Sequence, residues 1–291
     1  MTVLEWETQY NGKFRALMFT ASMGIEGGHS VICDRNDQNC FADWREKKVP
    51  AIGYLHSMAL AITSTTLSPA LICPSEYLHF LHVGLGSGTL VSFLLENFER
   101  WAHTVVEIDA EVINIAPQFG VYPSERLRLE HYDIAKFIQE NRCKNQYDGI
   151  IIDAYDFKDR IPEALLNAKL IAPCLSSDKH AFVVINLVPQ VIRQEEFFAL
   201  LYTYRLQFKF LYLIEGTEYN KILVAHNQDE QITIEELFYR SEFLFRNCNH
   251  PLMERGRGHY YNTNAGSFDD AWLWFSTINR QRPCVGFSCL L

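Results

Sequence analysis

Residues 81–89 read Leu81-His82-Val83-Gly84-Leu85-Gly86-Ser87-Gly88-Thr89, a glycine-rich turn that follows an apolar run and precedes a helix-like segment. Glycines let the backbone approach a ligand without a clash from a Cβ atom. A helix that begins directly after the turn adds free N–H donors and a partial positive charge. The pattern predicts a strand, a ligand-binding turn and a helix, although a tight turn that binds nothing has the same pattern.

The chain around this turn alternates between strand-like and helix-like periods. The predicted strands are 78–83, 104–108, 127–132, 147–153 and 182–187, and the predicted helices are 52–64, 89–98, 110–116, 134–140 and 162–172. Such alternation implies right-handed βαβ units and a parallel sheet covered on both faces. Two further strand-like runs, 208–214 and 221–226, have nothing helical between them and should pair antiparallel. The expected fold is α/β and Rossmann-like, with a mostly parallel seven-stranded sheet that ends in an antiparallel hairpin.

The two ends of the chain have a different character. Short β-rich runs at 4–10, 14–19 and 30–33 are interrupted by Asn11-Gly12, a strong hairpin signal. We therefore expect an N-terminal β-hairpin unit and loop over 1–50 and the Rossmann-like domain over 51–291. A helix is predicted over 234–245, and 250–291 is left unassigned.

Composition excludes several classes of function. The net charge of -9 and the sequence pI of about 5.6 disfavour binding to a phosphate backbone, so no nucleic-acid partner is expected. We expect no signal peptide, and no apolar run approaches the ~20 residues that span a bilayer. None of the 8 cysteines forms a C-x-x-C pair, so we expect no metal and no redox dithiol. A cytoplasmic protein with free thiols is expected.

The glycine pattern bears on the cofactor. A dinucleotide site requires G-x-G-x-x-G or a final alanine, but Thr89 stands at that last position. The order Gly84-x-Gly86-x-Gly88 instead fits a loop that meets the amino acid part of S-adenosylmethionine. The candidate cofactor-binding residues in this loop are Gly84, Leu85, Gly86, Ser87 and Gly88, and NAD is demoted without being excluded.

Two acidic residues follow the next two strands. Glu107 ends a strand roughly 20 residues after the turn, where a carboxylate can accept hydrogen bonds from both ribose hydroxyls, with Ile108 beside it. Asp133 follows the third strand, where it can accept from an adenine amino group while Ile134 packs on the ring. The alternatives are a surface carboxylate at 107 and a helix N-cap at 133, and the N-cap is compatible with ligand binding.

Carboxylates also follow the apolar strand Ile150-Ile151-Ile152. Because ligands of open α/β sheets bind at the carboxyl ends of the strands, Asp153 and Asp156 should lie near the reacting end of the cofactor. There they can attract a cationic amine and help to deprotonate it, so both are candidate catalytic residues, and Asp153 is also a candidate cofactor-binding residue. Tyr155 and Asn186 are weaker candidates for the acceptor pocket. The alternative is a pair of loop carboxylates that cap the next helix.

With these motifs, the chain resembles the spermidine-synthase-like branch of class I methyltransferases from about Phe14 to Gly258. Val106-Glu107-Ile108-Asp109 and Tyr147 to Ala154 are similar to that branch. Within it, the order and spacing of several stretches are closest to the C-terminal domain of the elongation factor 1A methyltransferases. The resemblance implies an S-adenosylmethionine-dependent methyltransferase that acts on an amine, with a protein such as translation elongation factor 1A as partner.

The resemblance leaves two alternatives open. The first is a spermidine or spermine synthase that transfers an aminopropyl group. Such enzymes carry Asp at the position of Ser87, a Tyr-Gln pair where this chain has Leu55 and His56, and a Tyr-Pro-Ser-Gly stretch near Tyr219-Asn220. The second is an inactive relative that only binds partners. A homodimer through the N-terminal β unit, as in related aminopropyltransferases, also stays open.

Overall fold

The computed structural model describes a large part of the chain. The described residues are 2–7, 13–18, 53–66, 77–155, 160–178, 180–188, 192, 194–215, 220–228 and 275–279. The predicted helix over 234–245, the third N-terminal run and Asp156 lie outside these residues. Among the helices that are described, none is long and apolar enough to cross a bilayer.

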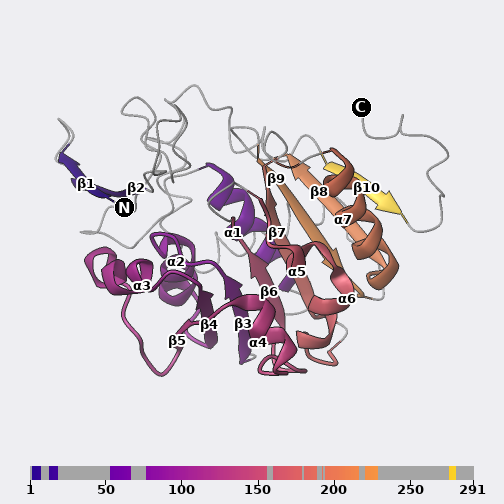
Figure 1. Cartoon of the computed structure of the whole chain (residues 1–291), viewed down its shortest axis with the longest axis horizontal. Helices are drawn as coiled ribbons and strands as arrows, with labels where there is room; N and C mark the ends of the chain where they lie inside the picture. Colours follow the sequence, from indigo (N-terminus) through magenta and orange to yellow (C-terminus); the bar gives the residue numbers. More distant parts are fainter. Residues whose placement is uncertain are drawn as a thin grey trace.

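One mixed sheet dominates the structure (Figure 1). Among the described residues its strands follow the order β10-β8-β9-β7-β6-β3-β4-β5. Their bounds are β3 Leu78–Val83, β4 Trp101–Glu107, β5 Leu127–His131, β6 Gly149–Ile152, β7 Phe182–Leu187, β8 Phe210–Glu215, β9 Lys221–His226 and β10 Phe275–Asn279. The pairs from β5 to β7 are parallel, whereas β9 pairs antiparallel with both β7 and β8. The predicted seven strands and their terminal hairpin are confirmed, and β10 is added at the edge beyond β8.

Helices cover both faces of the sheet. Their bounds are α1 Gly53–Thr66, α2 Thr89–Asn97, α3 Ala110–Ile115, η1 Ala116–Phe119, α4 Ile134–Gln139, α5 Glu163–Leu166, α6 Ala168–Ile171, η2 Ala172–Cys174 and α7 Gln194–Gln207. Side chains of α1 and α2 share one apolar core, and those of α4 to α7 share another. β6 shows why the layers form, because Ile151 enters the first core and its neighbours Ile150 and Ile152 enter the second. Alternate residues of a strand point to opposite faces, so a strand buried on both sides must be apolar throughout.

The N-terminal hairpin is present. β1 (Thr2–Glu7) pairs antiparallel with β2 (Lys13–Met18), with Thr2 opposite Met18 and Glu7 opposite Lys13. The Asn11-Gly12 dipeptide is in the segment between the two strands, which lies outside the described residues. The division into domains at residue 50 stays a prediction.

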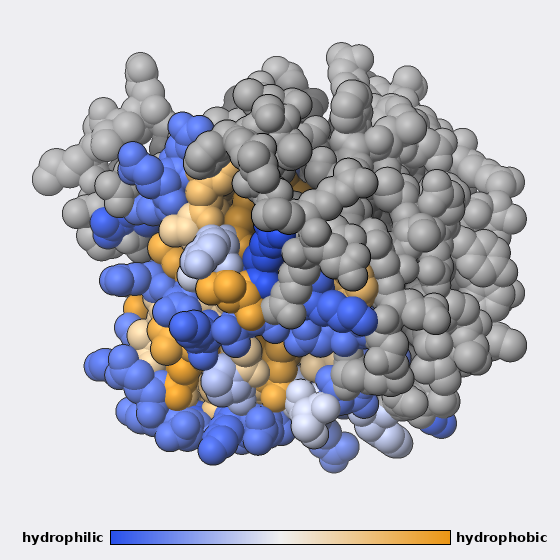
Figure 2. Space-filling model, turned by 90° about the vertical axis from the view of Figure 1, so that its right-hand side faces the viewer, coloured by the Kyte–Doolittle hydropathy of each residue, from blue (hydrophilic) through white to orange (hydrophobic). Residues whose placement is uncertain are grey.

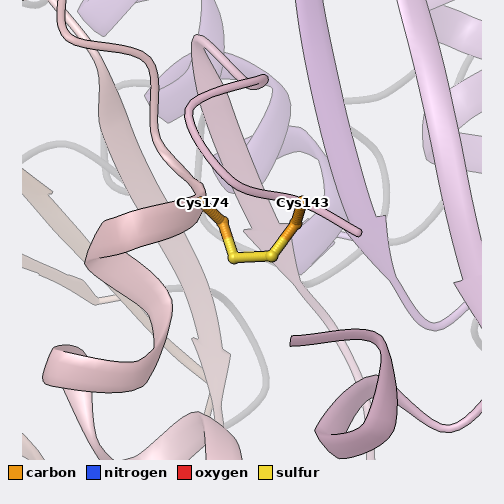
Figure 3. Close-up of a disulfide and its surroundings, with 2 residues drawn as sticks. All are labelled: Cys143 and Cys174. Atoms are coloured by element: carbon orange, nitrogen blue, oxygen red, sulfur yellow. A yellow bond between two sulfur atoms is a disulfide. The ribbon is translucent and has the colours of Figure 1, made fainter. Parts of the chain in front are cut away.

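Two cysteines correct the expectation of free thiols. Cys143, between α4 and β6, forms a disulfide with Cys174 at the end of η2, and their Cα atoms are 4.7 Å apart (Figure 3). Both residues are buried in the core beneath α4 to α7. The disulfide joins the segment before β6 to the segment before β7. The predicted cytoplasmic location stays a prediction.

Apolar side chains are also exposed on the outer side of the molecule. Tyr202 and Leu206 are one turn apart on α7 and are 65% and 50% exposed, and Leu170 on α6 is 43% exposed. The space-filling view shows apolar surface interspersed among hydrophilic side chains (Figure 2). Single exposed apolar residues are ordinary for a folded protein.

A buried histidine pair lies on the α1 and α2 side of the sheet. His82 of β3 and His103 of β4 are both under 5% exposed, and Nε2 of His82 is 2.9 Å from Nδ1 of His103. Two neutral rings supply one donor and one acceptor, whereas two protonated rings would place two donors face to face. Burial lowers the pKa of His82 to about 3 and the pKa of His103 well below its ordinary 6.5.

We expect this pair to make the fold sensitive to acid. The unfolded chain binds protons near pH 6.5, whereas the folded chain does not, so stability is full above that pH and falls below it. Each histidine should contribute up to about 1.4 kcal/mol per pH unit. Urea unfolding between pH 7.5 and 5 should therefore show a shallower pH dependence for His82→Gln than for the native chain. The same change at exposed His180 is the control, and equal slopes in all three proteins would contradict the prediction.

Candidate functional site

The glycine turn connects β3 to α2 at the carboxyl edge of the sheet. Gly84, Gly86 and Gly88 all have positive φ, at 91°, 53° and 73°. A Cβ on Gly84 would overlap the backbone carbonyl of Asp153, and a Cβ on Gly88 would lie 2.6 Å from Cγ2 of Val121. At Gly86, by contrast, a Cβ would meet no described atom within 4 Å. The turn therefore packs closely on two sides and is open at Gly86, where a ligand can approach the backbone.

The start of α2 is suited to a polar ligand. Its N-cap residue is Gly88, which offers no side chain to the first N–H groups of the helix. Ser87 is buried, and its hydroxyl is 2.8 Å from the hydroxyl of Thr89. The turn thus presents glycine backbone and a neutral hydroxyl pair, and it places no carboxylate at position 87.

Glu107 is fixed beside this turn by two backbone donors. Its Oε2 accepts from the N–H of Leu85 at 2.8 Å, and its Oε1 accepts from the N–H of Asp109 at 2.9 Å. The side chain is 8% exposed. Burial raises the pKa of Glu107, and the N–H groups of Asp109 and Leu85 oppose that shift by stabilising the charged form. The carboxylate is held in one orientation with lone pairs left to accept two hydroxyls.

Apolar surface adjoins this carboxylate. Ile108 directly follows β4 and is 67% exposed. Asp109 caps α3 by accepting from the N–H of Glu111 at 2.8 Å. Ile108 is therefore held between two fixed carboxylates, and its apolar side chain is available to a flat ring.

Asp133 and Ile134, which were predicted to meet the adenine, both have a structural role. Asp133 is the N-cap of α4, and its Oδ1 accepts from the N–H groups of Ala135 and Lys136 at 2.7 and 3.2 Å. The capping alternative is thus confirmed, and contact with adenine stays a prediction. Ile134 is 7% exposed and belongs to the core, so little of its side chain is left for a ligand.

A hydrogen-bonded cluster surrounds Asp153, which directly follows β6. Oδ1 accepts from Nδ2 of Asn186 at 2.8 Å, and Oδ2 accepts from the hydroxyl of Tyr54 at 3.2 Å. Asn186, in β7, is 3% exposed, and its Oδ1 accepts from Nδ2 of Asn220 at 2.8 Å. Burial raises the pKa of Asp153, although the bonds from Asn186 and Tyr54 lower it in part. We call Tyr54, Asp153, Asn186 and Asn220 the Asp153 cluster.

Tyr155 lies next to this cluster. Its hydroxyl donates to the backbone carbonyl of Asn186 at 2.8 Å. Burial and the nearby Asp153 carboxylate raise the pKa of Tyr155, so the phenol remains neutral. The structure therefore brings the predicted residues Asp153, Tyr155 and Asn186 together, while Asp156 lies outside the described residues.

Two members of the Asp153 cluster were not predicted from the sequence. Tyr54 comes from α1 and Asn220 directly precedes β9, and they are 99 and 67 positions from Asp153 along the chain. Their contacts depend on how the strands and α1 pack, and no local spacing indicates them. Tyr54 also bears on the aminopropyltransferase alternative. Spermidine synthases have a tyrosine at the position of Leu55, and here the neighbouring Tyr54 donates its hydroxyl to Asp153.

Comparison with known proteins supports this description. No family model matches the chain. A polyamine aminopropyltransferase from Vibrio vulnificus (strain CMCP6) is 28% identical over 161 residues, which make up 54% of this chain and 47% of that protein. An eEF1A lysine and N-terminal methyltransferase from Mus musculus is 29% identical over 209 residues, which make up 67% of this chain and 29% of that protein. The matched segment is thus less than half the length of either relative.

A solved structure extends the likeness to the fold. Human methyltransferase-like protein 13 in complex with SAH aligns with a TM-score of 0.59 and 23% identity, over 68% of this chain and 93% of that one. The chain therefore has the class I methyltransferase fold. It is similar to both the elongation factor methyltransferases and the aminopropyltransferases, and the resemblance found in its sequence is confirmed.

Proposed function

We propose that this chain is an S-adenosylmethionine-dependent methyltransferase that acts on an amine of a protein. The observation that carries the proposal is the fixed carboxylate of Glu107 beside the open glycine turn. An acidic residue held at the end of the second strand of such a sheet suits the two hydroxyls of a ribose. The exposed side chain of Ile108 suits an adenine ring, and the start of α2 suits the methionine moiety.

The residues around the glycine turn fit the cofactor. Gly84, Gly86, Ser87 and the start of α2 would hold its methionine end, Glu107 its ribose, and Ile108 with Asp133 its adenine. When bound, S-adenosylmethionine supplies an electrophilic methyl group on a sulfonium. The relatives that are named as methyltransferases and the solved complex with SAH support this assignment.

Asp153 would handle the proton of the acceptor. An amine must be uncharged to act as a nucleophile, and a cationic amine is attracted to a carboxylate. The raised pKa of Asp153 makes this carboxylate a stronger proton acceptor than an exposed aspartate. Asn186 and Tyr54 hold both of its oxygens, so the acceptor meets a carboxylate in a fixed orientation.

The acceptor is proposed by resemblance. The matched relative in Mus musculus acts on eEF1A by its name, and a protein amine of that kind is the substrate we propose. An aminopropyltransferase is the second candidate, because Tyr54 supplies a hydroxyl to Asp153 and because one relative is a polyamine aminopropyltransferase. The neutral Ser87 in the turn favours the first candidate over the second.

Calorimetric titration with three ligands tests the proposal. We expect S-adenosylmethionine to bind at least about tenfold more tightly than its decarboxylated form, a difference of ~1.4 kcal/mol, and NAD to bind too weakly to detect. A preference for the decarboxylated form would favour the second candidate, an aminopropyltransferase. Binding of none of the three by a folded protein would contradict enzymatic function and favour an inactive binding protein.

A further inference from the structure

The side-chain amide of Asn186 has a defined orientation in the Asp153 cluster, and Asn220 contributes to it. Asn186 lies between two partners and offers a different group to each, since its Nδ2 donates to Asp153 and its Oδ1 accepts from Nδ2 of Asn220. An amide can rotate to exchange its oxygen and its nitrogen, and the neighbouring groups decide which arrangement is favoured. Asn220 donates to the oxygen of Asn186, and the carboxylate of Asp153 accepts from its NH2 group, so both partners favour the same orientation of Asn186.

The opposite orientation would be unfavourable at both contacts. If Asn186 were turned, its NH2 group would face the NH2 group of Asn220, and its oxygen would face a carboxylate oxygen of Asp153. Asn186 is 3% exposed, so water cannot replace the lost partners. The backbone does not fix the amide, because the backbone carbonyl of Asn186 is engaged separately by the hydroxyl of Tyr155.

We propose that Asn220 is a positioning residue: through the side-chain amide of Asn186, it keeps a hydrogen-bond donor directed at Asp153, the group that accepts the proton of the acceptor amine. Among the described residues no hydrogen bond joins Asn220 to Asp153 directly, so Asn220 acts on Asp153 through the side chain of Asn186. The inference rests on the proposed function for its consequence in catalysis, but its structural part holds for the free protein.

The proposal separates Asn220 from an ordinary structural residue. Replacing Asn220 by aspartate keeps the size of the side chain and converts the donor into an acceptor. The two carboxylates then compete for the NH2 group of Asn186, and Asp153 loses some or all of one charge-assisted hydrogen bond. The pKa of Asp153 should rise by about one unit or more, because a bond of this kind is weakened and a negative charge is added nearby.

The closing experiment uses the full chain without cofactor. In the native protein, the side-chain NH2 signals of Asn186 should shift together with the carboxyl carbon of Asp153 in an NMR pH titration. In Asn220→Asp, those NH2 signals should instead follow the new carboxylate, and the midpoint of Asp153 should move upward by about one unit. In Asn220→Ala the Asp153 midpoint should lie between its values in the native protein and in Asn220→Asp, because this change removes the bond to Asn186 without adding an acceptor.

The matched control makes the same change at the other end of β9. Asn227 is exposed, and its Oδ1 accepts from the N–H of Lys209 at 2.7 Å, a bond that an aspartate retains, while the longer bond of 3.4 Å from its Nδ2 to the carbonyl of Gln207 is lost. Asn227→Asp should move neither signal. Coupling of the Asn186 NH2 group to Asp153 that persists in Asn220→Asp would overturn the proposal, and so would an unmoved Asp153 midpoint.

A transfer assay then tests the consequence separately. In Asn220→Asp, the rising limb of the pH–rate profile should move upward with the Asp153 midpoint, with cofactor affinity unchanged. If the NMR result is as expected but no transfer occurs in any variant or in the native chain, the proposed function fails and the positioning role stands. If transfer is normal and the limb does not move, the positioning role fails.

Discussion

Replacing Glu107 by glutamine should weaken the binding of S-adenosylmethionine by at least about a hundredfold, or ~2.7 kcal/mol. Both oxygens of the native carboxylate accept from backbone N–H groups, those of Leu85 and Asp109. An amide has one acceptor and one donor, so one of these N–H groups must lose its partner and the ribose must lose a charged acceptor. A charge-assisted bond and an unsatisfied buried donor each account for about 1–3 kcal/mol. Calorimetric titration of the purified variant measures the loss.

Two comparisons keep this result interpretable. Glu111→Gln removes the same charge from an exposed position at the start of α3, four residues away, and should bind the cofactor as the native chain does. Thermal denaturation of Glu107→Gln should show a folded protein, because the amide still fits the space of the carboxylate. A folded variant with native affinity would remove Glu107 from the ribose site and, with it, the observation on which the proposed function rests.

The parts of the fold that the sequence predicts are those with a strong local signal. β6 is apolar at each of Ile150, Ile151 and Ile152 because both of its faces are covered, and such a run has few other interpretations. The glycine turn and Glu107 are separated by one βαβ step, so their proximity follows from the topology of a parallel sheet. The prediction at Asp133 was ambiguous for a physical reason, since the same carboxylate that could meet a ligand also caps α4.

The features that the sequence did not predict depend on contacts between distant segments. α7 was not predicted, because the helix exposes Tyr202 and Leu206 and so lacks a simple apolar stripe. Tyr54 and Asn220 meet the Asp153 cluster only after α1 and β9 have packed beside β6 and β7. The disulfide joins cysteines 31 positions apart whose spacing matches no motif. In each case the decisive interaction joins residues that are distant in sequence, so the local pattern of apolar residues does not predict it.

The roles proposed for Glu107 and Asp153 differ, although burial shifts the pKa of both side chains in the same direction. Burial raises the pKa of each carboxylate. Glu107 is held by backbone N–H groups, which suits an acceptor that must remain charged and fixed. Asp153 is held by the side chains of Tyr54 and Asn186, which can respond to a change in its charge. The first arrangement suits binding, and the second suits the transient acceptance of a proton.

Asp153→Asn should reduce the turnover of an amine acceptor by about a hundredfold to ten-thousandfold, the range for the loss of a general base. Cofactor affinity should change little, because in the proposed site other residues bind the ribose and the adenine. A fall in kcat with native affinity for S-adenosylmethionine, from initial rates and calorimetry on the same preparation, is the expected result. Lost affinity with an unchanged kcat would instead place Asp153 in cofactor binding.

The same variant should become more stable than the native chain at neutral pH. Because the pKa of Asp153 is raised in the folded state, the native fold has its full stability below the ordinary value of 3.8 and loses part of it as the pH rises through the folded-state value. Asparagine does not titrate, and it can keep an acceptor toward Asn186. The stability advantage of Asp153→Asn should therefore be present at pH 7 and shrink on acidification toward pH 4, measured by urea unfolding.

Asp178→Asn, an exposed position before β7, should show neither the kinetic loss nor the gain in stability. A variant that loses turnover and stability together would indicate a structural role for Asp153, whereas lower turnover with higher stability is the signature of a carboxylate retained for chemistry.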